Sequence, residues 1–279
     1  GEIMAKTVLV FDFGASSARA MLCGFDGSSI TLKEIHRFEN NPIMENDKLC
    51  WDFEYLFSEV KNALSLAVFN GGFDAISIDS WGVDYGLINR GSELMSSPVH
   101  YRDKRTALVF EAMKEVVSFD ELYSRTGIYP NRINTVFQLY FQTVYEKNTM
   151  FSADKMLMIP DLLAYYLTGE MKTEFTNATT TQLVNTVSRD WDYELIDKLG
   201  IPKRIFCPII QPGEEYGLLC PSLAAELKIE QVPVIAAPSH DTASAIVSVP
   251  SVTKDFVFLS SGTWTLFGTE LDRPIANDE

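Results

Sequence analysis

The sequence has few of the residues that would support a zinc-bound, disulfide-bonded or membrane-spanning protein. It contains 4 cysteines and 3 histidines in 279 residues, and no cysteine pair has the C-x-x-C spacing of zinc sites. No apolar run reaches the roughly 18 residues that cross a bilayer, and no basic segment precedes an apolar stretch at the start. These absences predict a cytoplasmic protein with buried free thiols and no zinc site.

Positive charge is also scarce. Lysine and arginine number 23 against 38 aspartates and glutamates, which gives a net charge of −15. A surface this acidic repels nucleic acids and anionic membranes, so we expect neither as a partner. The length and the 46% hydrophobic content predict a folded globular protein of one large domain or about one and a half domains.

Asp241 stands where an apolar strand ends and a helix begins. The run Val232–Ala237 predicts a buried strand that ends at Pro238, and small helix-forming residues follow Asp241. Such a junction is the usual place for ligand chemistry in α/β folds. A carboxylate there can act as a general base toward an alcohol, or it can cap the helix. The segment alone leaves both roles open.

A second carboxylate, Asp12, lies in the apolar strand Val8–Phe13, just before a turn of small residues. Gly14 would let the backbone approach a ligand, and Ser16 and Ser17 offer hydroxyl and N–H groups to phosphate oxygens. Asp12 can hold Mg²⁺ through water molecules. The alternative is an ordinary hairpin turn. The apolar residues before Asp12 favour a central strand that ends at a ligand site, although no P-loop motif occurs.

The order of the expected elements is that of a ribonuclease-H-like α/β unit, in which three strands and a helix precede further strands. Asp52 is expected to cap a helix that runs through Phe69, and Val83–Ile88 is a further short strand. A mixed five-stranded sheet is expected. Its candidate strands are Val8–Phe13, Ala18–Phe25, Ser29–Phe38, Asp74–Asp79, Val83–Ile88 and Val232–Ala237.

Between Arg102 and Leu199 the pattern becomes helical and predicts an inserted lobe. After it, 206–219 is expected to be rich in loops. The candidate helices are Arg105–Val117, Phe119–Arg125, Asn134–Lys147, Pro160–Leu167 and Asp192–Leu199, with another at Pro221–Leu227. Two strands after Pro250, Phe256–Ser260 and Thr263–Gly268, have the pattern of a hairpin that opens another domain.

Several segments, in this order, resemble the FGGY carbohydrate kinases of the actin and hexokinase superfamily. They are the turn at Gly14, Asp79–Asp84 and Ser239–Thr242. Further segments resemble the branch of that family that phosphorylates L-rhamnulose, namely Glu34–Phe38, Tyr101–Asp103, Thr176–Leu183 and Leu259–Trp264. The resemblance spans essentially the whole chain. It implies two ribonuclease-H-like domains facing each other across a cleft, with the sugar on the first and the nucleotide mostly on the second.

The resemblance also implies roles for single residues. With Asp12 and Gly14, the first phosphate loop would contain Ala15, Ser16, Ser17, Ala18 and Arg19, whereas Thr263 would belong to a second loop. The sugar would contact Gly82, His240, Asp241 and Thr242, with Asp241 as the catalytic base. Ala18 stands where this family commonly has glycine.

Two neighbours of Gly82 are further candidates for sugar contact. Trp81 could stack on a sugar face at a pocket rim, or it could be a core aromatic at a strand end. Asp84 could accept a sugar hydroxyl, or it could be a carboxylate at a strand edge. The sequence leaves these alternatives open.

The activity that the resemblance implies is transfer of the γ-phosphoryl group of ATP, with Mg²⁺, to the 1-hydroxyl of L-rhamnulose, which gives L-rhamnulose 1-phosphate. The family's second domain continues well past Thr263. Residues 5–249 are therefore expected to form the first domain, and 250–279 an incomplete start of the second, so that this chain alone would be weakly active.

Other functions remain open at this stage. They are a silent sugar-binding protein, a kinase for a related ketose such as L-fuculose or xylulose, and an actin-like ATP hydrolase. We expect a monomer or a weak homodimer.

Overall fold

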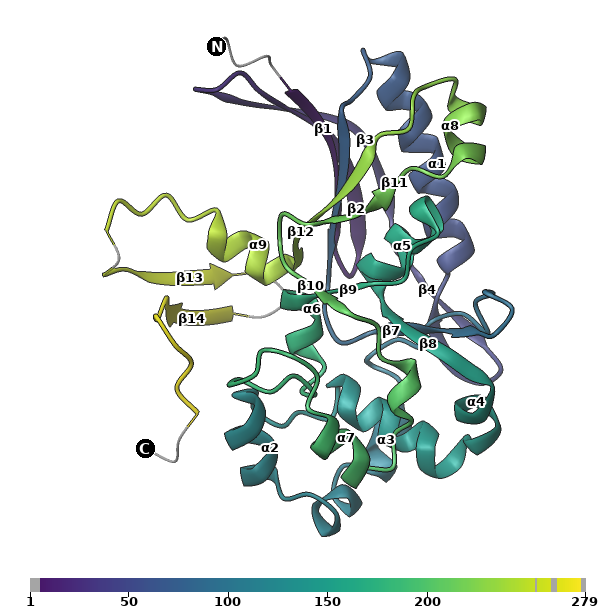
Figure 1. The fold of residues 1–279 in the computed structure, drawn as a ribbon, viewed down its shortest axis with the longest axis vertical. Coiled ribbons are helices and arrows are strands. Elements are labelled where there is room, and N and C mark those ends of the chain that lie inside the picture. Colours follow the sequence, from purple (N-terminus) through teal and green to yellow (C-terminus); the bar gives the residue numbers. More distant parts are fainter. Residues whose placement is uncertain (1–5, 254, 262–264, 277–279) are drawn as a thin grey trace.

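A mixed sheet forms the centre of the protein in the computed structural model, which describes residues 6–253, 255–261 and 265–276 (Figure 1). The sheet has six strands in the order β11-β12-β6-β1-β2-β3. Strands β1, β6 and β12 run parallel to one another, whereas β2 and β11 are antiparallel to β1 and β12. The strands are β1 (Lys6–Phe13), β2 (Ser17–Phe25), β3 (Ile30–Glu39), β6 (Ala75–Ser80), β11 (Glu215–Leu218) and β12 (Pro233–His240). This arrangement confirms the predicted fold class.

The sheet has one strand more than the five we predicted. The extra strand, β11, lies within the segment expected to be rich in loops, and it pairs with the free edge of β12. Its four residues carry no strong alternation, and only Tyr216 among them is buried. Pairing with an existing edge therefore decides the conformation of this segment, which local propensity does not.

Helix α1 (Phe53–Phe69) begins as predicted, because the Asp52 side chain accepts a hydrogen bond from the Tyr55 N–H. It packs against β3 and lies beside α8 (Pro221–Leu227) (Figure 1). Helix α5 (Ile159–Thr168) packs against β6, β11 and β12 and ends at Gly169, whose φ of 82° is the left-handed C-cap conformation.

The helical lobe has its own hydrophobic core below the sheet (Figure 1). It contains α2 (Phe119–Thr126), α3 (Thr135–Tyr145), α4 (Lys147–Ser152) and α7 (Tyr193–Lys198), with an antiparallel two-stranded sheet of β7 (Tyr85–Asn89) and β8 (Ala153–Met158). The remaining short elements include β4 (Pro42–Glu45) and β5 (Lys48–Trp51), which pair with each other between β3 and α1. Strands β9 (Thr173–Glu174) and β10 (Ile209–Ile210) pair in parallel, and α6 (Phe175–Thr180) and η3 (Lys203–Ile205) are short helices.

Two predicted helices differ in the structure. The segment 105–117 forms two short 3₁₀ helices, η1 (Lys104–Leu108) and η2 (Ala112–Glu115), instead of one α-helix. The helix expected over 134–147 ends at Tyr145, because Glu146 adopts the non-helical angles φ −122° and ψ 48° before α4 starts. No helix in the described part of the chain is long and apolar enough to cross a membrane.

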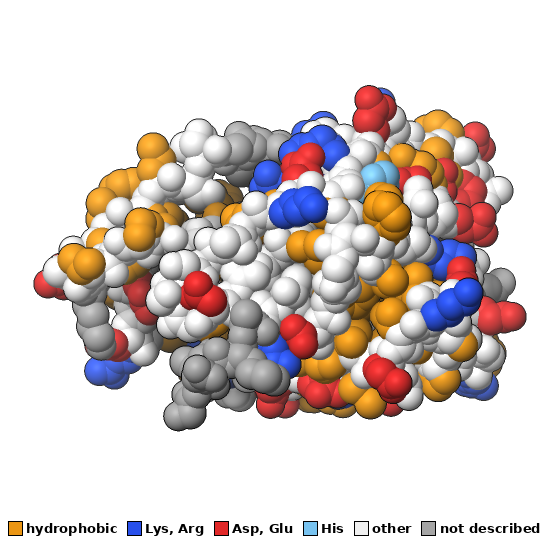
Figure 2. Space-filling view, turned by 90° about the horizontal axis from the view of Figure 1, so that it is seen from above, with side chains coloured by type: hydrophobic (Ala, Val, Ile, Leu, Met, Phe, Trp, Pro, Cys, Tyr) orange, Lys and Arg blue, Asp and Glu red, His pale blue; other side chains and the backbone are white. Residues whose placement is uncertain are grey.

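The described residues after 250 stand apart from the main sheet. Strands β13 (Val257–Ser261) and β14 (Thr265–Thr269) pair only with each other and lie beside α9 (Asp241–Val247) (Figure 1). Large apolar side chains in this segment are exposed, and Phe267 is 74% exposed. Figure 2 shows hydrophobic side chains at this end of the molecule. Residues 262–264 of the predicted hairpin lie outside the described residues.

Candidate functional site

Three aspartates lie at the edge of the sheet where its parallel strands end. In the register of β1 and β6, Asp12 is the partner of Asp79. In the register of β12 and β6, His240 is the partner of Ser80, and Asp241 follows His240 directly. Because the carboxyl ends of parallel strands share one edge, the fold brings the three carboxylates together at the place where α/β folds bind ligands.

Asp79 has the most perturbed ionisation of the three. Burial, followed by the nearby negative charges of Asp12 and Asp241, raises its pKa to about 8. Its Oδ1 atom is buried and has no hydrogen-bond partner in the described part of the protein. Asp79 is not among the site residues predicted from the sequence. Its position at the end of a strand, like that of Asp12, is the sequence feature that could have identified it.

The turn after β1 is held by hydrogen bonds within the turn and from Asn40. The Gly14 N–H donates to the Ser17 carbonyl at 2.9 Å. The Asn40 side chain donates to the Gly14 carbonyl at 2.9 Å, and the Asn40 N–H donates to the Ser16 carbonyl at 3.0 Å. A Cβ atom on Gly14 would lie 3.0 Å from the Ser17 carbonyl oxygen. A side chain at this position would therefore crowd the Ser17 carbonyl. The backbone conformation does not itself favour glycine, because the φ of Gly14 is not in the left-handed region.

The other residues of the predicted phosphate loop differ in their exposure. Ser16 is exposed, whereas Ala15 and Ser17 are partly buried. The Arg19 guanidinium is bound to Asp12, with its Nε 2.8 Å from Oδ2. The Ala18 methyl group is 1% exposed and packs in the hydrophobic core. The Ala18 side chain is therefore part of the core packing. Thr263 lies outside the described residues.

His240, Asp241 and Thr242 lie together where β12 ends. The helix α9 starts at Asp241, and His240 occupies its N-cap position without a capping hydrogen bond from the side chain. Asp241 Oδ1 accepts the Thr242 N–H at 2.5 Å and lies 3.5 Å from His240 Nε2. The Asp241 side chain remains 41% exposed. Burial lowers the pKa of His240, so its imidazole is neutral at pH 7 and can donate or accept a hydrogen bond.

Gly82 lies in a strained turn. The Asp84 N–H donates to the Gly82 carbonyl at 3.0 Å, which closes a three-residue turn around Val83. Val83 has a φ of 68°, a conformation that is unfavourable for a β-branched residue by about 1–3 kcal/mol. A Cβ on Gly82 would lie 2.7 Å from Thr180 Cγ2. Only glycine fits at this position without a shift of Thr180.

Trp81 and Asp84 are buried beside this turn, which favours the core alternative for Trp81. Trp81 is 5% exposed, and its ring centroid lies 4.2 Å from that of Trp51. Asp84 is fully buried and accepts hydrogen bonds from the indole N–H groups of Trp51, at 2.7 Å, and Trp81, at 3.1 Å. It also accepts bonds from the Tyr101 N–H and the Gln138 side chain. Burial raises the pKa of Asp84 to about 6. The sequence does not show these donors converging, because they come from distant segments.

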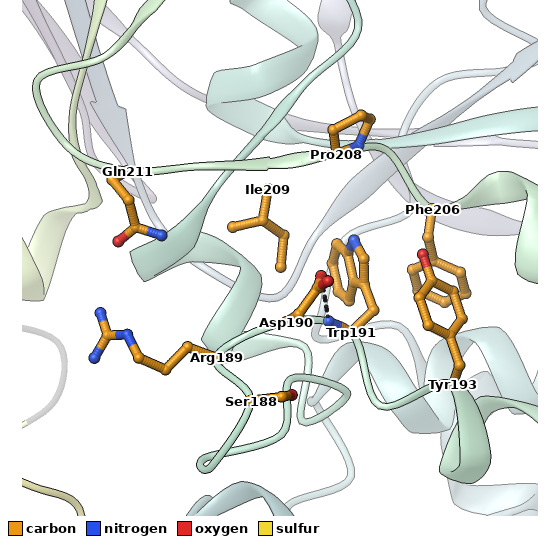
Figure 3. Close-up of a pocket in the computed structure, with 9 residues that line it drawn as sticks. All are labelled: Ser188, Arg189, Asp190, Trp191, Tyr193, Phe206, Pro208, Ile209 and Gln211. Carbon is orange, nitrogen blue, oxygen red and sulfur yellow. Dashed lines mark hydrogen bonds between the residues drawn. The ribbon is translucent and has the colours of Figure 1, made fainter.

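A pocket of about 490 Å³ lies elsewhere, between the segments 188–193 and 206–211 (Figure 3). The Arg189 and Gln211 side chains lie on one side of it, and the Trp191, Phe206 and Tyr193 rings lie on the other (Figure 3). None of the predicted site residues lines this pocket. The aspartates at the strand ends are therefore a separate site.

Known proteins with similar sequences match nearly all of this chain but only about half of their own length. Residues 7–248 match the FGGY family of carbohydrate kinases, N-terminal domain. The chain is 39% identical over 273 residues to a rhamnulokinase of Pectobacterium atrosepticum, a match that covers 96% of this chain and 54% of the relative. It is 41% identical over 269 residues to a rhamnulokinase of Halalkalibacterium halodurans, with 96% and 57% coverage. The chain therefore spans about half the length of these relatives.

Solved structures share the fold. A gluconate kinase from Lactobacillus acidophilus superposes with a TM-score of 0.87 at 20% identity, over 98% of this chain and 55% of that one. A xylulose kinase from the same organism superposes with a TM-score of 0.86 at 20% identity, over 97% and 55%. At this identity the likeness concerns the fold alone. The match over 7–248, together with the relatives at about 40% identity, shows that the chain belongs to the FGGY family of carbohydrate kinases.

Proposed function

We propose that this chain is the sugar-binding part of an ATP-dependent kinase that phosphorylates the 1-hydroxyl of L-rhamnulose. The observation that carries the proposal is the half-exposed Asp241 carboxylate beside His240 and Thr242, at the same sheet edge as Asp12 and Asp79. The choice of sugar is supported by the relatives of 39% and 41% identity, both of which are named rhamnulokinase.

In the proposed reaction, Asp241 accepts the proton of the sugar 1-hydroxyl as the bond from its oxygen to the γ-phosphorus forms. The bond between that phosphorus and the bridging oxygen of ADP breaks, and ADP leaves. His240, Thr242 and Gly82 orient the sugar. Since the protein does little covalent chemistry in such a transfer, catalysis rests on positioning and electrostatics. The turn after β1 would contact phosphate oxygens through N–H groups other than that of Gly14, which donates to the Ser17 carbonyl.

Asp12 and Asp79 are the residues that would hold Mg²⁺. Their carboxylate oxygens are suitable ligands for this ion, and the unpartnered Asp79 Oδ1 offers a site beside Asp12. An ion held by these two residues would keep most of its waters and would also bind substrate phosphates. When bound, the ion neutralises charge on the phosphates.

The proposal also divides the chain into two domains. We assign 5–249 to the sugar-binding domain and 250–279 to the start of a nucleotide-binding domain. Two observations support the assignment: the family match ends at residue 248, and β13 and β14 form a sheet of their own. A cytoplasmic location and small-molecule partners, the sugar and ATP, belong to the same proposal.

Substitution of Asp241 tests the proposed base. We expect Asp241→Asn to lower phosphoryl transfer by roughly 10²–10⁴-fold, because an amide cannot accept the proton. The assay would use a chimaera in which residues 7–248 replace the matching region of the Halalkalibacterium halodurans relative. The control is Glu226→Gln, the same kind of change at an exposed position of α8. Transfer within a few-fold of the unsubstituted chimaera would remove Asp241 from the role.

A further inference from the structure

The short helix α6 (Phe175–Thr180), with Glu174 before it, contacts both segments that carry the proposed sugar contacts. Its start binds the segment of Ser239 and His240, and its end binds the turn of Gly82 and Val83. The helix therefore joins two parts of the candidate site.

The first contact replaces missing strand pairing. The pairing of β12 with β6 is interrupted between Ala236 and His240. In this gap the Ser239 N–H donates to Glu174 Oε2 at 3.0 Å, and the Asn177 side chain donates to the Ser239 carbonyl at 3.2 Å. The His240 N–H donates to the Thr176 hydroxyl at 3.2 Å. Side chains of one short segment thus satisfy the backbone groups that precede Asp241.

Glu174 is the centre of this contact. Its side chain is fully buried, and its carboxylate also accepts the Ser239 hydroxyl at 2.7 Å. Within its own segment it accepts the Thr176 N–H, the Thr176 hydroxyl and the Asn177 N–H. The Glu174 N–H donates to the buried Asp161, at 3.0 Å. Five hydrogen bonds thus converge on the Glu174 carboxyl group, two of them from Ser239, so Glu174 holds Ser239 in place.

The second contact is at the other end of the helix. The Val83 N–H donates to the Thr180 hydroxyl at 2.9 Å, and that hydroxyl donates to the Asn177 carbonyl at 2.7 Å. The same Thr180 side chain packs directly against Gly82. Asn177 therefore binds Thr180 through its carbonyl and Ser239 through its side chain. A continuous set of hydrogen bonds runs from Val83 to Ser239.

We propose that α6 sets the position of Gly82 relative to Asp241, with Glu174 and Thr180 as positioning residues that act through the two segments. The inference rests on the proposed function only in that it takes these segments as the sugar contacts. Loss of either anchor should then disturb both segments, because a single short helix holds them.

Amide hydrogen exchange of the 279-residue chain tests the coupling without any ligand. Glu174→Gln removes an acceptor, because an amide nitrogen cannot accept a bond, and Thr180→Val removes the hydroxyl while it keeps the shape. We expect each variant to speed exchange roughly 10-fold or more at Val83 and also at Ser239 and His240. Glu226→Gln should change neither, and Thr180→Ser, which keeps the hydroxyl, should behave like the unsubstituted chain. Faster exchange only at the end that carries the substitution would overturn the proposal.

Calorimetric titration with L-rhamnulose, at a temperature where every variant is folded, adds a readout that a merely structural role would not change. We expect Kd to rise roughly 10-fold in Glu174→Gln and in Thr180→Val. The double variant should lose less than the product of the two effects, since both act through one helix. Affinities within twofold of the unsubstituted chain, despite lower melting temperatures, would contradict positioning. If the unsubstituted chain binds no L-rhamnulose, the proposed sugar fails, and the exchange experiment still decides the coupling.

Discussion

Asp79 lies opposite Asp12 in the parallel register, and burial with two neighbouring carboxylates raises its pKa to about 8. In the unfolded chain the pKa of Asp79 returns to its ordinary value of 3.8. Between these values the folded state therefore binds more protons than the unfolded state. The free energy of unfolding should decrease as the pH rises from about 4 to about 8. Above that range the contribution of Asp79 to this free energy should be constant.

Asp79→Asn should remove this pH dependence, because the amide stays neutral. We expect the variant to gain stability relative to the unsubstituted chain as the pH rises from about 4 to about 8. The measurement is the melting temperature of both proteins across that range, with Glu226→Gln as the exposed control. Parallel curves for the two proteins would show that Asp79 does not titrate as described.

The sequence predicts the site residues that are set by local order and misses those set by distant contacts. Asp241 and its neighbours were predicted because a strand end followed by a helix start is visible in a few residues. Glu174 was not, because its partner Ser239 is 65 positions away. The burial of Trp81 likewise depends on Trp51, which comes from β5.

At the scale of elements, the turn at Gly82 and the helix α6 fit each other closely. A Cβ on Gly82 would lie 2.7 Å from Thr180 Cγ2, so the added methyl group must displace one of the two elements. We expect Gly82→Ala to lower the free energy of unfolding by about 1–3 kcal/mol, as overpacking usually does. Denaturant unfolding measures this change.

Two further variants control the Gly82 experiment. Gly91→Ala should have a smaller effect, since its Cβ would come no closer than 3.1 Å, to the Asn89 side chain. Addition of Thr180→Ser to Gly82→Ala removes the nearest methyl group and should restore part of the loss. A double variant no more stable than Gly82→Ala would show that the contact with Thr180 is not the cause.

Elements with strong local signals were predicted, and those that depend on tertiary pairing were not. Helix α1 has both a capping aspartate and a regular apolar face, so its bounds follow from the sequence. The segment of η1 and η2 buries Arg105, Val109, Met113 and Val117 at helical spacing, which is why the sequence predicts one α-helix where the structure has two short 3₁₀ helices. Strand β11 needed the edge of β12 to form.

At the scale of the whole molecule, the chain consists of a well-packed body and an exposed hairpin. The sheet and the helical lobe each have a buried core. In contrast, Val257 is 66% and Leu259 is 65% exposed in β13. Isolated two-stranded sheets are marginally stable in water. The body is thus the part of the chain to which we assign the proposed sugar site.

Calorimetric titration of the 279-residue chain with L-rhamnulose tests directly whether this chain binds the proposed sugar. We expect saturable binding that is stronger than the binding of L-fuculose or D-xylulose. We also expect Asp241→Asn to keep the affinity within a few-fold, because the amide retains the size and hydrogen-bonding reach of the carboxylate. A folded chain that gives no heat with L-rhamnulose, or that binds all three ketoses equally, would contradict the account.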